Sequence, residues 1–539
     1  MRRVRNLLAK GLASGIGSAL IFGCLATRAE AASWAGENFT DLRWSLSANW
    51  QFLTLPGVGD SVFLDNGTNS ITTAGQTLMN INCTLSFLSM NVSGATGTID
   101  GDNGAHTMSM QNGSSVLLGP NTGTLQLGVV GNLLPLNLLG QVTFSDSSAT
   151  QLIAVAGSLE GSGGITKAGS GRLRFNADNS GYSGAVTVSV GTVILFTSGG
   201  LGSGSAVLNG GTLSLQNVAT AFASPVAVNS VAGNAFDVVG IASTASGSIT
   251  GSGGFTKTGS GTLTLSHANS YSGGTSIAAG VLTLGSVTGV GSGSVTVGSG
   301  TIFNVAGFAP VIATLSGAGS VTLGSGTLTA GDSTATTFSG VISGTGKFIK
   351  QGSGSITFSG TNSSYSGGTF ITGGMLVIAG DGSLGGIPGS PATNLTFSGS
   401  GGTLQVSGDV TLNANRNVLL SSNATFDTNS HALTIPGTLT GSGSLTEIGG
   451  GTLALTNYTT SAGTTVSNGI LLMSGTNNSF AGITGTSGSL TIASSAAAVS
   501  DGVQLATLTV TGSHAIRANG TASGVSKVTT LSIAGSTGA

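Results

Sequence analysis

The sequence predicts an all-β protein with the fold of a right-handed parallel β-helix (β-solenoid), and three observations carry that prediction. Glycine accounts for 94 of the 539 residues, while only 6% of the residues are charged. Short segments that alternate polar and apolar residues recur between clusters of glycine and serine. Similar blocks begin at Gly161, Gly251, Gly344 and Gly441, at separations of 90, 93 and 97 residues. A solenoid grows by adding such units, each of which packs on its neighbours.

The composition excludes several other classes of protein. Disordered chains combine low hydrophobicity with high charge, but here 39% of the residues are hydrophobic and the mean hydropathy is +0.38. Collagen requires glycine at every third position, and that period is absent. Helical bundles need charged surfaces, which this chain cannot supply. The remaining composition is one of strands and tight turns.

Residues 1–31 are predicted to be a secretory signal peptide. The first ten residues carry four basic side chains, the stretch from Gly11 to Leu25 is uncharged and apolar, and Ala29-Glu30-Ala31 forms a cleavage pattern. Two alternatives fit less well. Ile21–Cys24 is a poor lipoprotein box because Phe22 is bulky, and the residues that follow Arg2-Arg3 do not suit twin-arginine export.

Cleavage after residue 31 would leave 10 basic and 16 acidic residues, a net charge of −6. So few basic residues form no stripe, which argues against nucleic-acid binding. Cys83 would be the single remaining cysteine, so no disulfide could form within the chain.

Residues 32–157 are predicted to form an aromatic N-terminal cap and the first coils. The first coil of a solenoid exposes an unpaired edge and an open core, which a cap must cover. A sugar-stacking platform is the alternative role for these rings. The aromatic residues concerned are Trp34, Trp44 and Trp50, together with Phe39, Phe52 and Phe63.

Residues 158–473 are predicted to be a β-helix with four copies of the repeat unit, and residues 474–539 to be further, incomplete C-terminal coils. Thr262–Leu265 and Gly280–Leu284 alternate polar and apolar residues, the pattern of half-buried strands. A coil of roughly 20–25 residues would fit about four times into each unit. We expect the leucines at 263, 265, 282 and 284 to point inward and to stack on adjacent coils.

Two residue types mark the repeat. Tyr182, Tyr271 and Tyr365 occupy corresponding places, and in the fourth block Thr460 aligns with them. Basic residues also correspond across the blocks, namely Lys167, Lys257 and Lys350, with Glu447 in the fourth. These lysines could form an exposed row of cations that binds anionic polymers. We favour solubilising charges at turns, because neighbouring copies would lie about 20 Å apart.

The blocks resemble the autotransporter-associated β-strand repeat, also called the passenger-associated transport repeat. The similarity is close for residues 158–195, 248–284 and 341–378, and weaker for 438–473. The segment from Trp44 to Phe63 also resembles the start of bacterial proteins with these repeats. The resemblance implies a parallel β-helical passenger that Gram-negative cells export, with repeats that assist passage across the outer membrane.

The same resemblance implies a partner in export, either outer-membrane translocation machinery or a C-terminal barrel that is missing here. The sequence stops at Ala539 in repeat-like residues, so we expect a fragment of a longer protein. The implied location is the cell surface or the extracellular space, in association with the outer membrane. Surface polysaccharide or a host or matrix ligand are the possible binding partners, and nucleic acid is not one.

No residue is predicted to be catalytic, to bind a cofactor or to hold a metal. Gly59–Val62 resembles an esterase nucleophile block, but the acid-histidine pair that this chemistry needs is represented only by the badly spaced Asp427 and His431. Gly346-Lys347 lacks the flanking residues of a phosphate loop. The four histidines, at positions 106, 267, 431 and 514, are isolated, which argues against zinc.

The predicted function is therefore that of a structural or adhesive passenger, not of an enzyme. The alternative is a β-helical carbohydrate-active enzyme, similar to a polysaccharide lyase or hydrolase. Such enzymes need clustered acids, whereas Asp332, Asp381, Asp409 and Asp427 lie 49, 28 and 18 residues apart. The fold alone does not carry the activity.

Overall fold

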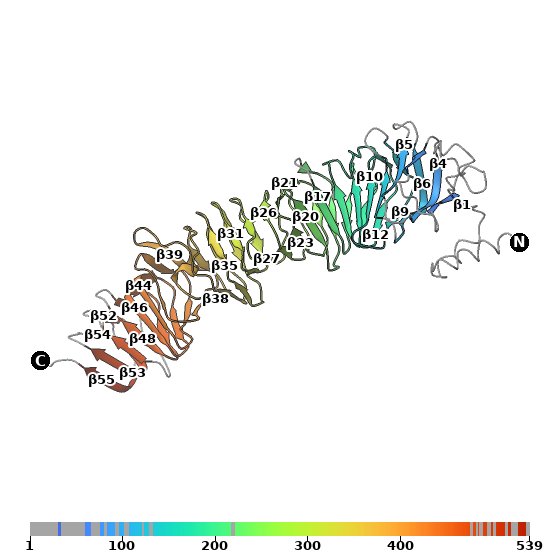
Figure 1. Cartoon of the computed structure of the whole chain (residues 1–539). Helices are drawn as coiled ribbons and strands as arrows, with labels where there is room; N and C mark the ends of the chain where they lie inside the picture. The colour runs from blue at the N-terminus through green and yellow to red at the C-terminus, as the bar shows by residue number, and fades with distance from the viewer. Residues whose placement is uncertain are drawn as a thin grey trace. The chain divides into compact units, whose positions relative to one another are not determined.

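The computed structural model is an all-β, parallel β-solenoid of about 16 turns (Figure 1). Its contacts divide it into two compact units, residues 1–186 and 187–539. The part of the chain that the structure describes comprises residues 31–33, 60–65, 76–79, 83–91, 96–101, 107–120, 123–128, 133–216, 221–474, 478–480, 483–484, 489–492, 497–499, 503–511, 516–518 and 527–534.

In the first unit, strands of successive turns pair in parallel and form two faces of the coil. One face contains β2 (Asp60–Asp65), β4 (Cys83–Asn91), β6 (Met108–Leu118), β9 (Val142–Ser145) and β12 (Ile165–Ala168). The other contains β3 (Gln76–Met79), β5 (Thr96–Gly101), β7 (Thr124–Leu127), β10 (Leu152–Val155) and β13 (Arg172–Phe175).

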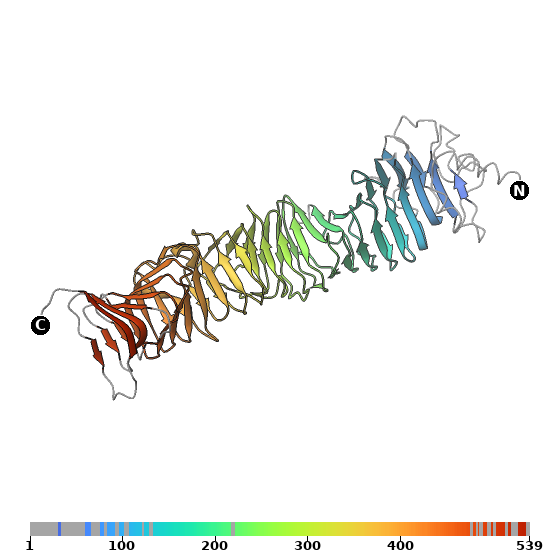
Figure 2. The ribbon, with the colours of Figure 1, turned by 90° about the horizontal axis from the view of Figure 1, so that it is seen from below.

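Within the second unit, strands of successive turns also pair in parallel, and Figure 2 displays them side by side. One column runs through β20 (Ala235–Val239), β23 (Phe255–Thr258), β25 (Thr275–Ile277) and β27 (Val295–Val297). A second runs through β21 (Ala242–Ala245), β24 (Thr262–Leu265), β26 (Val281–Leu284) and β28 (Ile302–Asn304).

Towards the C-terminus of this unit, further columns carry the residues discussed below. One includes β32 (Thr327–Ala330), β35 (Lys347–Lys350), β37 (Thr369–Ile371), β39 (Ala392–Phe397), β42 (Arg416–Leu420), β44 (Ala432–Gly441) and β46 (Thr452–Thr460). Another includes β38 (Met375–Ile378), β40 (Gly402–Val406), β43 (Ala424–Asp427), β45 (Leu445–Ile448) and β47 (Thr464–Val466). A 3-10 helix, η3 (Asp381–Leu384), follows β38.

The expected inward stacking of leucines is confirmed. Leu263 pairs in register with Leu282, and Leu265 with Leu284, one turn further along the chain. All four side chains are buried, while Thr264 between the first two is half-exposed. Alternation with a period of two therefore places each apolar residue in a column inside the coil.

The glycine that begins each block is required by the backbone. The φ angles of Gly161, Gly251, Gly344 and Gly441 are 85°, 114°, 113° and 145°, a region that L side chains rarely adopt. A Cβ atom at Gly161 would also lie 2.5 Å from the carbonyl oxygen of Leu138 on the preceding turn. These corners need glycine both for conformation and for close contact between coils.

The predicted cap falls largely on residues outside the described ranges. All three tryptophans, as well as Phe39 and Phe52, lie there, and Phe63 lies in β2. The predicted signal peptide likewise lies outside the described residues, apart from Ala31 in β1 (Ala31–Ser33). Both expectations remain predictions.

Candidate functional site

The repeat lysines point into the coil, which corrects the expectation that they are exposed. Lys167, Lys257 and Lys350 are each 0% exposed. Each occupies an inward position of its strand, as Phe255 does two residues before Lys257 in β23. The physical reason is that the ammonium group has backbone partners at the turn that follows its strand.

The Lys257 side chain illustrates these partners. Its Nζ atom donates to the carbonyl oxygens of Thr258 at 2.7 Å, Gly259 at 2.8 Å and Ala279, on the next turn, at 3.2 Å. Lys350 makes the matching three bonds, to Gln351, Gly352 and Gly373. A buried ammonium group that satisfies all three donors in this way closes the corner of one coil onto the next.

An aspartate accompanies each buried lysine. Lys167 Nζ lies 2.7 Å from Asp146 Oδ2, and both side chains are 0% exposed. Burial lowers the pKa of Lys257 to about 8, and the charge of Asp237 opposes that shift. Burial likewise lowers the pKa of Lys350 to about 8 against the opposing charge of Asp332.

Sequence reasoning missed these pairs, although a signal for them exists. The aspartates at positions 146, 237, 332 and 427 are separated by 91, 95 and 95 residues, close to the spacing of the blocks. Each lies 18 to 21 residues before the lysine or glutamate of its block, which is about one coil. The repeat therefore contains two charged positions on neighbouring coils.

The fourth copy of this pair consists of two acids, which corrects the expectation from the sequence spacing that Asp427 lies apart from other acids. Glu447 replaces the lysine and is 0% exposed, and the residue after it, Ile448, pairs in register with Asp427. The pKa of Glu447 is raised to about 7, mainly by burial; a hydrogen bond from Thr428 opposes the shift, and the charge of Asp427 adds to it.

The repeat tyrosines form a second set of buried polar groups. The hydroxyls of Tyr271 and Tyr365 share hydrogen bonds with Thr275 at 2.6 Å and with Thr369 at 2.7 Å. The fourth copy retains a buried tyrosine, Tyr458, whose hydroxyl lies 2.7 Å from Thr464 Oγ1. Thr460, which the block alignment placed at this position, instead donates to the Gly443 carbonyl.

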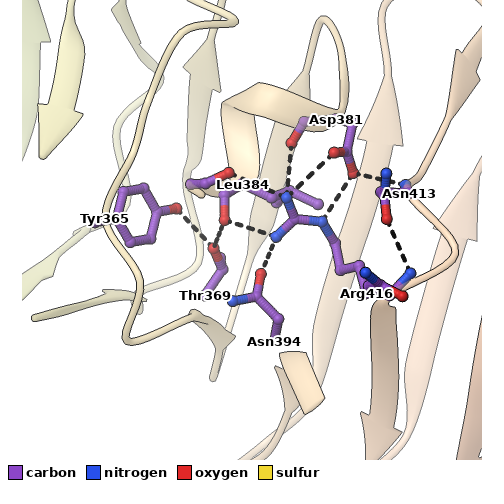
Figure 3. Close-up of polar contacts among 9 residues, drawn as sticks. Tyr365, Thr369, Asp381, Leu384, Asn394, Asn413 and Arg416 are labelled. Atoms are coloured by element: carbon purple, nitrogen blue, oxygen red, sulfur yellow. Dashed lines mark hydrogen bonds and ion pairs between the residues drawn. The ribbon is translucent and has the colours of Figure 1, made fainter. Parts of the chain in front are cut away.

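A buried arginine holds the loop that contains η3 against the coil (Figure 3). Arg416, the first residue of β42, is 0% exposed. Its Nε atom lies 2.8 Å from Asp381 Oδ1, and its Nη atoms donate to the carbonyls of Leu384 at 3.1 Å and Gly385 at 3.0 Å. Arg416 Nη1 also donates to Asn394 Oδ1. The fork of the guanidinium group thus crosslinks three segments of chain.

The remaining candidate residues are scattered over the fold. Asp332 accepts hydrogen bonds from the backbone and hydroxyl of Thr334, two residues away. Asp409 lies 3.6 Å from His431 Nδ1, and both side chains are exposed. Asp60 begins strand β2. His106 and His514 lie outside the described residues.

A surface hollow with a volume of about 460 Å³ lies in the second unit. It crosses four neighbouring segments of successive coils, and its lining contains no charged side chain. A neutral, hydroxyl-rich surface of this kind suits contact with an uncharged polar partner. Its polar lining residues are Ser230, Asn234, Ser252, Thr256, Thr275, Ser276, Ser294 and Thr296.

Two further findings concern the described residues. They contain no group of three or more His, Cys, Asp or Glu side chains placed to hold a metal ion. Across the same part of the chain, no helix has the length and apolar character needed to cross a membrane.

Comparison with known proteins identifies the repeat. The family model described as passenger-associated-transport-repeat matches residues 165–195, 255–284 and 348–378. Over an alignment of 178 positions, which covers 31% of this chain, the sequence is 36% identical to the protein named "Adhesin BmaC autotransporter" of Brucella suis biovar 1 (strain 1330). That alignment spans 5% of the length of the adhesin. No solved structure matches the chain.

The matched segments coincide with the first three blocks, each of which contains a buried lysine and a buried tyrosine. The repeat predicted from the sequence is therefore confirmed, and this chain carries three segments that match the passenger-associated transport repeat.

Proposed function

We propose that this chain is an exported adhesive passenger that acts at the cell surface or outside the cell. The observation that carries the proposal is that one chain contains both three transport repeats and a segment that is 36% identical to an autotransporter adhesin. A β-solenoid suits this role because each coil contacts only its neighbours, so the fold presents a long surface of repeated strands.

The surroundings of the acidic residues favour a structural or adhesive role over catalysis. Asp381 is bound by Arg416, Asp332 by Thr334, and Asp427 accepts a hydrogen bond from Gln405. Glu447 and Asp427 are adjacent, but Glu447 is fully buried, so the pair cannot reach a substrate in solvent. A β-helical lyase or hydrolase remains the alternative function.

The proposal includes the steps of export. Residues 1–31 direct secretion, and the exported chain then meets outer-membrane translocation machinery. The fold that it adopts is a right-handed coil. The aromatic residues between Trp34 and Phe63 cover the first coil. The chain is expected in association with the outer membrane, and its division into cap, repeat region and C-terminal coils follows the boundaries given above.

We infer that the neutral hollow around Ser252 and Ser276 belongs to the adhesive surface. Its lining carries hydroxyl groups from neighbouring coils. An uncharged polar ligand, such as a neutral surface polysaccharide, would match this chemistry, because a charged ligand would find no opposite charge there.

Adhesion can be tested with labelled protein that spans residues 32–539, applied to host cells, matrix proteins and neutral polysaccharides. We expect saturable binding to at least one of these surfaces and its loss after heat denaturation. A variant with Ser252→Glu and Ser276→Glu should bind more weakly, whereas Ser333→Glu and Ser359→Glu, outside the hollow, should not change binding.

Two outcomes would contradict the proposal. A folded protein without saturable binding to any of these surfaces is not an adhesin for them. Release of reducing ends or of unsaturated sugar from a polysaccharide substrate would favour the enzymatic alternative.

A further inference from the structure

The fourth copy of the repeat places a carboxyl group where the other copies bury an ammonium group. Glu447 pairs in register with Phe426 of the preceding turn, as Lys257 pairs with Phe236 and Lys167 with Phe144. The local backbone frame is therefore the same, and only the side-chain charge differs.

The walls around the two kinds of side chain also correspond. A Cβ atom at Gly374 would lie 2.8 Å from Lys350 Nζ, and one at Gly469, just before the matching strand of the fourth copy, would lie 2.7 Å from Glu447 Oε1. The Cβ position at Gly469 also lies 2.7 Å from the carbonyl oxygen of Gly451. The carboxyl group thus occupies the space that an ammonium group fills in the other copies, next to a backbone carbonyl oxygen that can accept a hydrogen bond.

The hydrogen bonds of Glu447 are incomplete. Its Oε1 atom accepts a bond of 3.2 Å from the Thr428 hydroxyl. Its Oε2 atom is buried and has no hydrogen-bond partner within the described ranges. An ionised carboxylate in this position would leave one charged oxygen without a donor, which is costly in a buried site. A protonated carboxyl group can instead donate a hydrogen bond.

The charges that face Glu447 add to this cost. Strand β43, on the preceding turn, contributes Asp427, and β47, on the following turn, contributes no titratable side chain. Between residues 427 and 473 the other titratable residues are His431, which lies near Asp409, and the buried Tyr458. Among the described residues, no cation shifts the pKa of Glu447 or takes the place that lysine fills in the other repeats.

We propose that Glu447 is a proton-dependent latch, which holds its coil closed when it is protonated and loosens the coil when it ionises. This inference goes beyond adhesion and does not depend on it. The segment concerned is residues 441–473, between the start of the fourth block and the end of β48 (Ile470–Met473); it contains the coil of Glu447 and the strands of the next turn that pair with it.

The sign of the effect follows from where the proton resides. The pKa of Glu447 is raised from 4.5 to about 7 in the folded chain. Below pH 4.5 the folded and unfolded states both hold the proton, and between 4.5 and about 7 only the folded state does. The stability of the folded state therefore falls as the pH rises through this window. Above pH 7 the stability levels off, because Glu447 is ionised in both states.

Hydrogen exchange of the full chain, followed by mass spectrometry between pH 4.5 and 8 and corrected for intrinsic exchange, measures this opening. We expect the opening constant of peptides within residues 441–473 to rise with pH, by at most about tenfold per pH unit up to pH 7. Peptides within residues 344–378, which contain the buried Lys350, are the internal control and should remain flat up to pH 7, below the pKa of about 8 of that lysine.

Two variants separate the latch from a merely structural role. Glu447→Gln, which cannot ionise, should remove the pH dependence of residues 441–473. Glu447→Lys, which restores the residue of the other repeats beside Asp427, should protect this coil equally well at pH 5 and pH 8.

The proposal is overturned if the parent and the glutamine variant share the same pH dependence, or if the parent coil opens equally at every pH. It is also overturned if millimolar calcium abolishes the pH dependence of the parent coil and raises its melting temperature, but leaves the glutamine variant unaffected. That result would mean that the two acids hold a cation instead of a proton.

Discussion

Lys167 Nζ lies 2.7 Å from Asp146 Oδ2, and neither side chain is exposed to solvent. The two residues belong to successive turns, since Lys167 pairs in register with Phe144. Removing two charges from water costs several kcal/mol, which their attraction only partly recovers. A pair of this kind adds little net stability, but it penalises any register in which one partner is buried alone.

Chemical labelling distinguishes buried from exposed lysines within a single strand. Lys347 and Lys350 lie at the two ends of β35; the first is exposed and the second is 0% exposed. We expect an amine-reactive reagent to modify Lys347 rapidly and to leave Lys350 unmodified in the folded protein, as measured by mass spectrometry of the digested chain. Equal labelling of both lysines would contradict the burial of Lys350 and would support the expectation that the repeat lysines are exposed.

The Lys167–Asp146 pair can be examined with a double-mutant cycle. Lys167→Met leaves the Asp146 carboxylate buried without its cation, and we expect a loss of about 3–5 kcal/mol in the free energy of unfolding. The double variant Lys167→Met, Asp146→Leu should recover most of this loss, because both charges are then absent. Denaturant unfolding measures both quantities. A double variant no more stable than the single one would contradict this account.

Leu265 tests the inward column of the repeat. It is buried and stacks on Leu284 of the next turn, so Leu265→Asp places an unpaired charge in the core. We expect this variant to lose several kcal/mol of stability and to melt well below the parent. Thr264→Asp, on the outward face of the same strand, is the matched control and should melt within a few degrees of the parent.

Arg416 tests the attachment of the loop that contains η3. Arg416→Met removes the donors that hold the Asp381 carboxylate and the carbonyls of Leu384 and Gly385. We expect a loss of about 3–5 kcal/mol and faster proteolysis between residues 380 and 391. Arg416→Lys keeps the charge but not the fork, so it should restore only part of the protection. Unchanged cleavage in both variants would show that the loop is held by other contacts.

The repeat, its β character and the inward leucines could be predicted from residues alone, because their causes are local. An alternation with period two assigns each side chain of Thr262–Leu265 to one face, and positive φ at a corner such as Gly251 demands glycine. Similar blocks at regular separations then require similar coils. The alignment of tyrosines failed only in the fourth block, where Tyr458 and Thr464 are six residues apart and the corresponding pair, Tyr365 and Thr369, is four apart.

Whether the charged residues are buried or exposed was decided by tertiary structure. Lys257 lies two residues after the buried Phe255 and therefore faces the same side of the strand. Burial of a lysine is favourable only if carbonyl groups and an acid from other turns surround it. For Lys257 those partners are 20 to 22 residues away in the sequence. Asp381 and Arg416 are 35 residues apart, across a loop whose length breaks the regular spacing of the coils. Local patterns determined which face each residue occupies, and the stacking of distant turns determined whether a charge on that face could be buried.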